Sequence, residues 1–163
     1  MAYFDIALFE VNGELSKRLG YRKIYCSGKD FEISKRLGST GLPQIVINKD
    51  PGTLIGAVRN GGVAGIIFEE NELSKKVVEK AEETKKTIFI PIRQLMGVPT
   101  RTRGSRVNGI RKIISAARRI DARVRLISLA DSGNMLLSAA QMAEMANLLF
   151  DGRSDALFGG DIL

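Results

Sequence analysis

The stretch PQIVINKDPGTLIGAVRNGGVAGIIF (residues 43–68) contains two short apolar runs separated by a segment with helical spacing. The runs at 43–48 and 62–68 are rich in β-branched residues, a composition typical of strands. Residues 51–60 between them carry the spacing and capping signals of a helix. A strand, a helix and another strand in this order predict a parallel βαβ unit whose helix covers a sheet.

The same alternation extends over most of the chain. Apolar runs recur at 2–8, 22–26, 86–92 and 124–129, and helical patterns occupy 14–20, 30–38, 71–85, 104–121 and 134–149. Six or seven βα units in series predict an α/β fold of the TIM-barrel type, although ordinary TIM barrels need about 200 residues or more. This chain has 163 residues. We therefore expect a single domain over 1–163, folded as a compact or partly trimmed TIM-like barrel.

Two of the helical segments have a readable apolar face. Segment 71–85 starts at Asn71 and places Ser74, Val77, Val78 and Ala81 on one stripe. Segment 104–121 is expected to bury one stripe, formed by Val107, Ile110, Ile113, Ile114, Ala117 and Ile120. The pentapeptide Glu-Leu-Ser-Lys-Arg at 14–18 recurs as Glu-Ile-Ser-Lys-Arg at 32–36 and as Glu-Leu-Ser-Lys-Lys at 72–76, which we interpret as reused helix chemistry.

The chain has no histidine and one cysteine. Without histidine, the Ser-His-Asp and Cys-His nucleophile arrangements, His-ligated zinc and the usual general base near neutral pH are excluded. Cys26 lies in an expected strand and has no internal partner, so we expect it to be a small buried hydrophobe. The start of the chain has no basic region, and no apolar run reaches the ~18 residues of a membrane span. These features predict an untargeted, cytoplasmic protein.

Positive charge is concentrated between Arg93 and Arg125. This stretch holds nine arginines and Lys112 against one acid, Asp121, while the whole chain carries a net charge of +7. Such a localised block predicts a polyanionic partner, because each phosphate that Arg or Lys neutralises releases condensed counterions. Aromatic residues make up 6% of the chain and tryptophan is absent, which argues against a binder that stacks successive bases. Nucleic acid held by charge is the first candidate.

The segment QLMGVPTRTRGSRVNG (94–109) follows the fifth expected strand and is predicted to be a loop. The carboxyl ends of parallel strands are where α/β folds bind ligands. Guanidinium groups hold phosphate bidentately, so this arginine-rich loop favours phosphate recognition. The candidate RNA-binding residues are Arg93, Arg101, Arg103, Arg106, Arg111 and Lys112. The alternative is a solvated loop whose charge serves solubility only.

Other interpretations stay open for the flanking residues. Arg93 could instead form an ion pair within the barrel, with Glu69 or Asp5. Arg111, Lys112, Arg118 and Arg119 could be no more than the solvated back of an amphipathic helix. The acids Glu69, Glu70 and Asp131 lie near expected strand ends, but they lack a recognised spacing for Mg2+, so no catalytic or metal site is predicted.

Residues in several expected elements match a known family in order and spacing. They are Asp5, Ser16–Tyr21 (Ser-Lys-Arg-Leu-Gly-Tyr), Gly62-Val63 with Ile66-Ile67, Ile92–Leu95 (Ile-Arg-Gln-Leu), Asn108, Arg111, Val124-Arg125, Ser128 and Ala130. In these positions the chain resembles the barrel-shaped protein component three of archaeal ribonuclease P, related to the thirty-kilodalton subunit of the eukaryotic enzyme. Family members usually open the last long helix with an Arg-x-Pro-Arg-Asp-like signature. This chain reads Leu137-Ser138-Ala139-Ala140-Gln141 there and is shorter, so no role of that signature is carried over.

The resemblance implies a noncatalytic subunit of an endoribonuclease. In the family, the RNA subunit catalyses Mg2+-dependent removal of the 5′ leader from precursor tRNA, so Mg2+ is expected with the RNA and no cofactor with the protein. The implied partners are ribonuclease P RNA, precursor tRNA and other protein subunits, including a small α/β protein. The isolated chain is then expected to be inactive. Two alternatives remain: a small barrel enzyme that binds a phosphorylated metabolite, and a general RNA-binding module.

Overall fold

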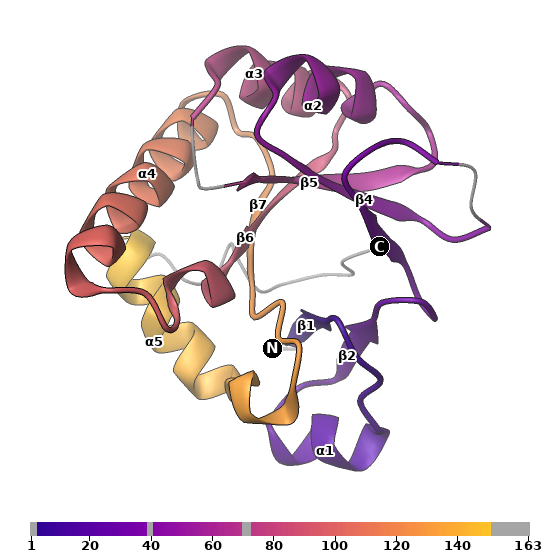
Figure 1. The fold of residues 1–163 in the computed structure, drawn as a ribbon, viewed down its shortest axis with the longest axis vertical. Helices are drawn as coiled ribbons and strands as arrows, with labels where there is room; N and C mark the ends of the chain where they lie inside the picture. Colours follow the sequence, from indigo (N-terminus) through magenta and orange to yellow (C-terminus); the bar gives the residue numbers. More distant parts are fainter. Residues whose placement is uncertain (1–2, 39–40, 70–72, 151–163) are drawn as a thin grey trace.

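The computed structural model describes residues 3–38, 41–69 and 73–150. Parallel strands alternate with helices, and in Figure 1 the helices lie around the outside of the strands. The elements in chain order are β1 (Phe4–Ala7), α1 (Gly13–Arg18), β2 (Lys23–Cys26), β3 (Glu32–Ser34), β4 (Gln44–Asn48), α2 (Pro51–Val58), β5 (Val63–Phe68), α3 (Lys75–Glu83), β6 (Thr87–Pro91), the 3-10 turn η2 (Ile92–Leu95), α4 (Thr100–Arg119), β7 (Val124–Ile127), the 3-10 turn η3 (Gly133–Met135) and α5 (Ala139–Phe150).

The strands form two sheets, one of β1 and β2 and one in the order β3-β4-β5-β6-β7, and every pairing is parallel. Two single parallel bridges, Ala7–Ala130 and Ser27–Phe31, connect the edges of these sheets. The expected α/β fold of parallel strands alternating with helices is confirmed. The expected TIM-like barrel is not, because the ladder is interrupted at both junctions and no closed barrel forms among the described residues.

Strand residues are buried alternately on the two faces of the sheets. The face toward the helices carries residues such as Val46, Ile66 and Ile88, which pack with the apolar stripes of α2, α3, α4 and α5. The opposite face carries a second group, which we call the inner cluster: Phe4, Ile6, Tyr25, Phe31, Ile45, Ile67, Phe89, Ile127 and Leu129. Burial on both faces explains why the strands read as continuous apolar runs in the sequence.

Asp5 connects β1 to the end of β7. Its Oδ1 atom accepts hydrogen bonds from the backbone amides of Ser128 (2.7 Å) and Ile6 (2.8 Å), and the side chain is fully buried. Burial raises its pKa to about 6, against the hydrogen bonds from Ser128 and Ile6, which lower it. Leu129, the residue after Ser128, has a φ of 49°, and its amide donates to the Ile6 carbonyl at 3.0 Å. A leucine in the left-handed region is strained, and the contacts to β1 hold it there.

Residues 30–38 are not the expected helix. Glu32–Ser34 form the edge strand β3, paired with β4, and Phe31 is fully buried in the inner cluster with Ile33 packed against it. Phe31 and Ile33 both contact the inner cluster, a spacing of two that is a strand signal and that the Glu-Ile-Ser-Lys-Arg repeat obscured. Tertiary packing therefore overrides the local helix chemistry at this position.

The other helices follow the expected faces with different limits, except that Ile120, expected in the buried stripe of 104–121, is exposed just past the end of α4. Val77, Val78 and Ala81 are buried as predicted, but α3 begins at Lys75, and the expected start at Asn71 lies outside the described residues. Segment 134–149 divides into η3 and α5. Cys26 is buried in β2, as expected. In the described ranges, no helix has both the length and the apolar character to cross a bilayer.

Gly65 in β5 has no room for a side chain. A Cβ atom there would stand 2.4 Å from the Thr87 carbonyl oxygen and 2.5 Å from Cε2 of the buried Phe89 ring. Both neighbours belong to β6, which pairs with β5 at this point. The glycine therefore lets an inner-cluster aromatic ring cross over its neighbouring strand.

We predict that Gly65→Ala lowers the free energy of unfolding by about 1–3 kcal/mol, because the paired strands or the Phe89 ring must shift. Urea denaturation measures the change. Gly56→Ala is the matched control, since this exposed helical glycine has nothing within 4 Å of its Cβ position. Its free energy of unfolding should rise by about 0.5–1 kcal/mol, the usual advantage of Ala over Gly within a helix. Equal stability of Gly65→Ala and the wild type would contradict the packing described.

A second prediction concerns pH. The pKa of Asp5 is raised in the folded state, so its contribution to stability is fully present below the unfolded value of 3.8 and is lost as the pH rises through about 6. The stability of the wild type relative to Asp5→Asn should therefore fall by roughly 2–3 kcal/mol between pH 4 and pH 7. Urea titrations at several pH values test this.

Asp50 supplies the control of opposite sign. This N-cap residue of α2 has a lowered pKa because the Thr53 hydroxyl and amide donate to its carboxylate. The stability of the wild type relative to Asp50→Asn should fall as the pH drops through the folded pKa of Asp50, below 3.8. A difference between wild type and Asp5→Asn that stays constant with pH would refute the Asp5 interpretation.

Candidate nucleic-acid interface

Most of the candidate cations lie on α4. This helix forms because Ile110, Ile113, Ile114 and Ala117 make one buried stripe. It begins at Thr100, so Arg101, Arg103 and Arg106 lie in its first two turns, and the prediction of a loop over 94–109 was wrong for its second half. No side chain caps its start and its first turn holds no acid. The positive end of the helix dipole therefore adds to the positive charge of the arginines.

Two of these arginines hold the segment that precedes the helix. Arg103 donates from Nη2 to the Val98 carbonyl at 3.2 Å, and Arg106 donates from Nη1 to the Gln94 carbonyl. Arg106 is half-buried. Both guanidinium groups therefore have a structural task in joining η2 to α4.

Two other arginines hold the end of α5. Arg111 donates to the Leu148 carbonyl at 3.0 Å, and Arg118 donates to the Phe150 carbonyl at 2.7 Å and lies 5.6 Å from the Phe150 ring centre. The last carbonyls of a helix have no partner within it, so basic side chains here complete its C-terminal turn. Arg111 thus acts as a clamp between two helices as well as a surface cation.

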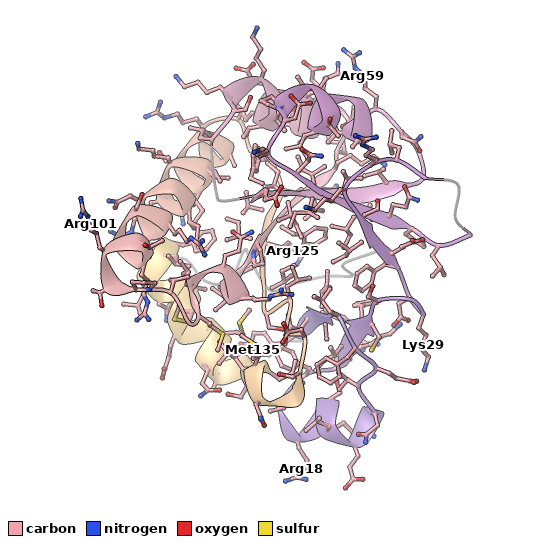
Figure 2. All side chains as sticks on the ribbon, viewed as in Figure 1. Arg18, Lys29, Arg59, Arg101, Arg125 and Met135 are labelled. Atoms are coloured by element: carbon pink, nitrogen blue, oxygen red, sulfur yellow. The ribbon has the colours of Figure 1, made fainter. Side chains whose placement is uncertain are left out.

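The open stripe of α4 carries Arg101, Lys112 and Arg119, all exposed. Figure 2 shows Arg101 pointing away from the body of the molecule. Within the described part of the chain, none of the three makes a hydrogen bond or an ion pair, so their charge is available to a partner.

A groove of about 480 Å³ runs between this stripe and the start of α3. Its described lining consists of Leu73, Lys75, Asn108, Arg111, Lys112, Ser115, Ala116 and Arg119. Four of these side chains are cationic, two can donate neutral hydrogen bonds, and no acid is among them. A groove of this composition matches the phosphates and sugars of a nucleic-acid backbone.

Arg93 stands apart from the helix. It lies in η2 after β6, and its Nη2 is 3.6 Å from Oδ2 of Asp131, which follows β7. Arg93 therefore forms an ion pair, as the alternative predicted, but its partner is Asp131 and not Glu69 or Asp5. Glu69 pairs with Lys35, with 3.7 Å between Oε1 and Nζ. Both Arg93 and Asp131 are about half exposed, so this pair at the strand ends contributes little to stability.

Arg125 belongs to the arginine-rich stretch 93–125, but it does not line the basic groove. It is half-buried in β7 on the same side as Ile127 of the inner cluster, and burial lowers its pKa, with a smaller effect from the charge of Arg123. Among the residues described, no group of three or more Cys, Asp or Glu side chains could hold a metal ion. The acid Glu70 lies outside those residues.

The structure brings together part of the predicted set. Arg111 and Lys112 share the groove, Arg101 extends the same stripe, and Arg93 and Arg106 do not join them. The sequence analysis missed the groove's contribution from Lys75 and left Arg119 as an open alternative. The sequence did contain a signal for the α4 side of the groove, because residues 108, 112, 115 and 119 have the i, i+3 and i+4 spacing of one helical face.

No protein-family model and no curated protein sequence matches the chain. Solved structures do. One is a crystal structure of an uncharacterised protein, with 12% identity and a TM-score of 0.51 over 71% of this chain, which spans only 31% of the length of that protein. Another is a chain in a cryo-EM structure of archaeal ribonuclease P with mature tRNA, with 11% identity and a TM-score of 0.56 over 90% of this chain and 82% of the other. At these identities, the likeness shows a shared fold.

Proposed function

We propose that this chain binds RNA through the outer stripe of α4 and the groove beside α3. The observation that carries the proposal is the groove itself, lined by Lys75, Arg111, Lys112 and Arg119 with no acid among its described lining residues. Four cations in one place are costly unless an anion is bound, because like charges repel. The row of charges extends from Arg119 to Arg101 over 18 residues of helix, about 27 Å. This length suits a phosphate backbone better than a single phosphorylated metabolite.

We propose further that the RNA belongs to ribonuclease P and that the chain is one of its protein subunits. Two findings support this: the fold likeness to a chain of archaeal ribonuclease P over 90% of this chain, and the sequence resemblance that extends from Asp5 to Ala130. In this proposal the ribonuclease P RNA carries the chemistry with Mg2+, and precursor tRNA is the substrate. The protein, in the cytoplasm, contributes RNA contacts and binds other protein subunits, including a small α/β protein.

The strand arrangement fits an incomplete relative of the TIM barrel, which we include in the proposal. The single bridges Ala7–Ala130 and Ser27–Phe31 continue the parallel sense of the two sheets at both of their edges. The inner cluster and the side chains packed on it draw on all seven strands, from Phe4 of β1 to Ile127 of β7. A trimmed barrel would place α4 and its cations on the outer surface.

We predict that Lys112→Ala with Arg119→Ala weakens RNA binding and flattens its salt dependence. Each phosphate contact contributes about 0.7–0.9 to the slope of log K against log salt concentration, so the slope should fall by about 1.4–1.8. Filter binding of ribonuclease P RNA between 50 and 300 mM salt measures it. The melting temperature should change little, since both side chains are exposed and lack partners among the described residues.

The control is Arg18→Ala with Lys29→Ala, which removes the same charge from sites that Figure 2 places away from α4. It should leave the slope nearly unchanged. Equal slopes for the α4 double variant and the wild type would remove this face from the interface. A shallow slope that depends on one or two arginines would favour an enzyme that binds a phosphorylated metabolite.

The assignment to ribonuclease P has its own test. We expect the tagged chain, purified gently from its native host, to bring with it 5′ cleavage of precursor tRNA that nuclease treatment of the eluate abolishes. Bound RNA without cleavage would indicate a general RNA-binding module. Cleavage that persists in the RNA-free protein with Mg2+ would contradict a noncatalytic role.

A further inference from the structure

An apolar groove of about 540 Å³ lies between α4, α5 and the residues after β6, next to the basic groove, with which it shares Arg111. One wall is the α4 row Arg103, Val107 and Arg111, and the facing wall is the α5 row Met145, Leu148 and Leu149. The floor includes Ile92, Leu95, Met96 and Leu137. The α4 row spans eight residues of helix, about 12 Å, so the groove is elongated along the two helices.

Leu148 makes this groove unusual for a free surface. Its side chain is 65% exposed, more than any other large hydrophobic residue in the described part of the chain. Met96 and Met145 are only partly buried beside it. Methionine side chains are flexible and polarisable, and exposed together with leucine they are typical of surfaces that accept a helix of another protein. The residues present an apolar strip with no cover among the described elements.

Charge defines what could cover the strip. The two charged residues that line it, Arg103 and Arg111, are both exposed and stand about two turns apart, at i and i+8 on one helix. Each has donated one nitrogen to a backbone carbonyl and keeps its remaining donors for another acceptor. No acid is among the described residues that line the groove. An occupant with carboxylates beside its apolar side chains would match these two guanidinium groups.

We propose that this groove binds an amphipathic helix of a partner protein, with an apolar stripe that packs between α4 and α5 and acidic residues that meet Arg103 and Arg111. A second copy of this chain is disfavoured, because it carries a net charge of +7 and the described helices offer no acidic amphipathic face. Among them only α5 has a net negative charge, from Glu144 alone, and the three glutamates of α3 share that helix with three lysines. The proposal does not rest on RNA binding, since its apolar residues Leu148 and Met145 do not line the basic groove, although Arg111 lines both grooves.

The test uses the full chain labelled with nitrogen-15 and two synthetic 18-residue helical peptides with the same apolar stripe, one flanked by glutamate and one by lysine. We expect the glutamate peptide to shift the amide signals of Met96, Val107 and Leu148 and to bind at least tenfold more tightly than the lysine peptide. Leu148→Asp should weaken that binding at least tenfold. Leu37→Asp, which changes another exposed leucine, should leave it unchanged.

Arg103→Gln separates charge from apolar contact, because it should reduce the preference for glutamate over lysine while leaving Leu148 in place. Leu148→Gln should also weaken binding of the glutamate peptide, and because it adds no charge beside Arg111, its RNA affinity should equal that of the wild type, so loss of peptide binding can be told from loss of RNA binding. Equal binding of both peptides, or no shifts with millimolar peptide, would overturn the proposal. Concentration-dependent shifts of the same amides without peptide would assign the groove to a second copy instead, and would also overturn it.

Discussion

The hydrogen bond from the Ser128 amide to Asp5 Oδ1 joins the first strand to the end of the last across 123 residues of sequence. β1 also meets the segment after β7 through the Ala7–Ala130 bridge and the hydrogen bond from the Leu129 amide to the Ile6 carbonyl, and the buried carboxylate adds to these contacts in fixing where β1 lies. A carboxylate serves this task because one oxygen can accept from two amides at once. Its desolvation appears as the raised pKa, and the strained backbone of Leu129 lies directly beside it.

Alternation of apolar runs and helical segments was sufficient to predict the fold class. The strands at β1, β2 and β4 to β7 were found because both of their faces are buried, which leaves long β-branched runs. β3 was missed because it is three residues long and its local sequence repeats that of α1. Barrel closure could not be predicted, since it depends on hydrogen bonds of single residues such as Ala130 rather than on a pattern.

The sequence predicted which residue types make up the candidate site, but not how they are arranged in space. The excess of arginine identified α4 as a basic element, but glycine and proline before it suggested a loop where the helix has already begun. Sequence could not separate Arg101, which points into solvent, from Arg106, which is half-buried against the Gln94 carbonyl. Nor could it bring Lys75 to the same groove, because that depends on how α3 packs beside α4. Charge counts predict a class of partner, and packing decides which charges remain available to it.

The contacts of the first 26 residues also bear on how the chain folds. Besides Asp5, the Tyr21 hydroxyl donates to the Leu137 carbonyl, and the Ala139 amide donates to the Leu19 carbonyl. The partners of β1, α1 and β2 thus lie largely between Ser128 and Ala139, near the other end of the sequence. Contacts this distant in sequence carry a large loop-closure entropy and form slowly. The N-terminal βαβ unit, though synthesised first, should therefore be among the last parts to dock, with apolar residues such as Phe4 and Tyr25 uncovered until then.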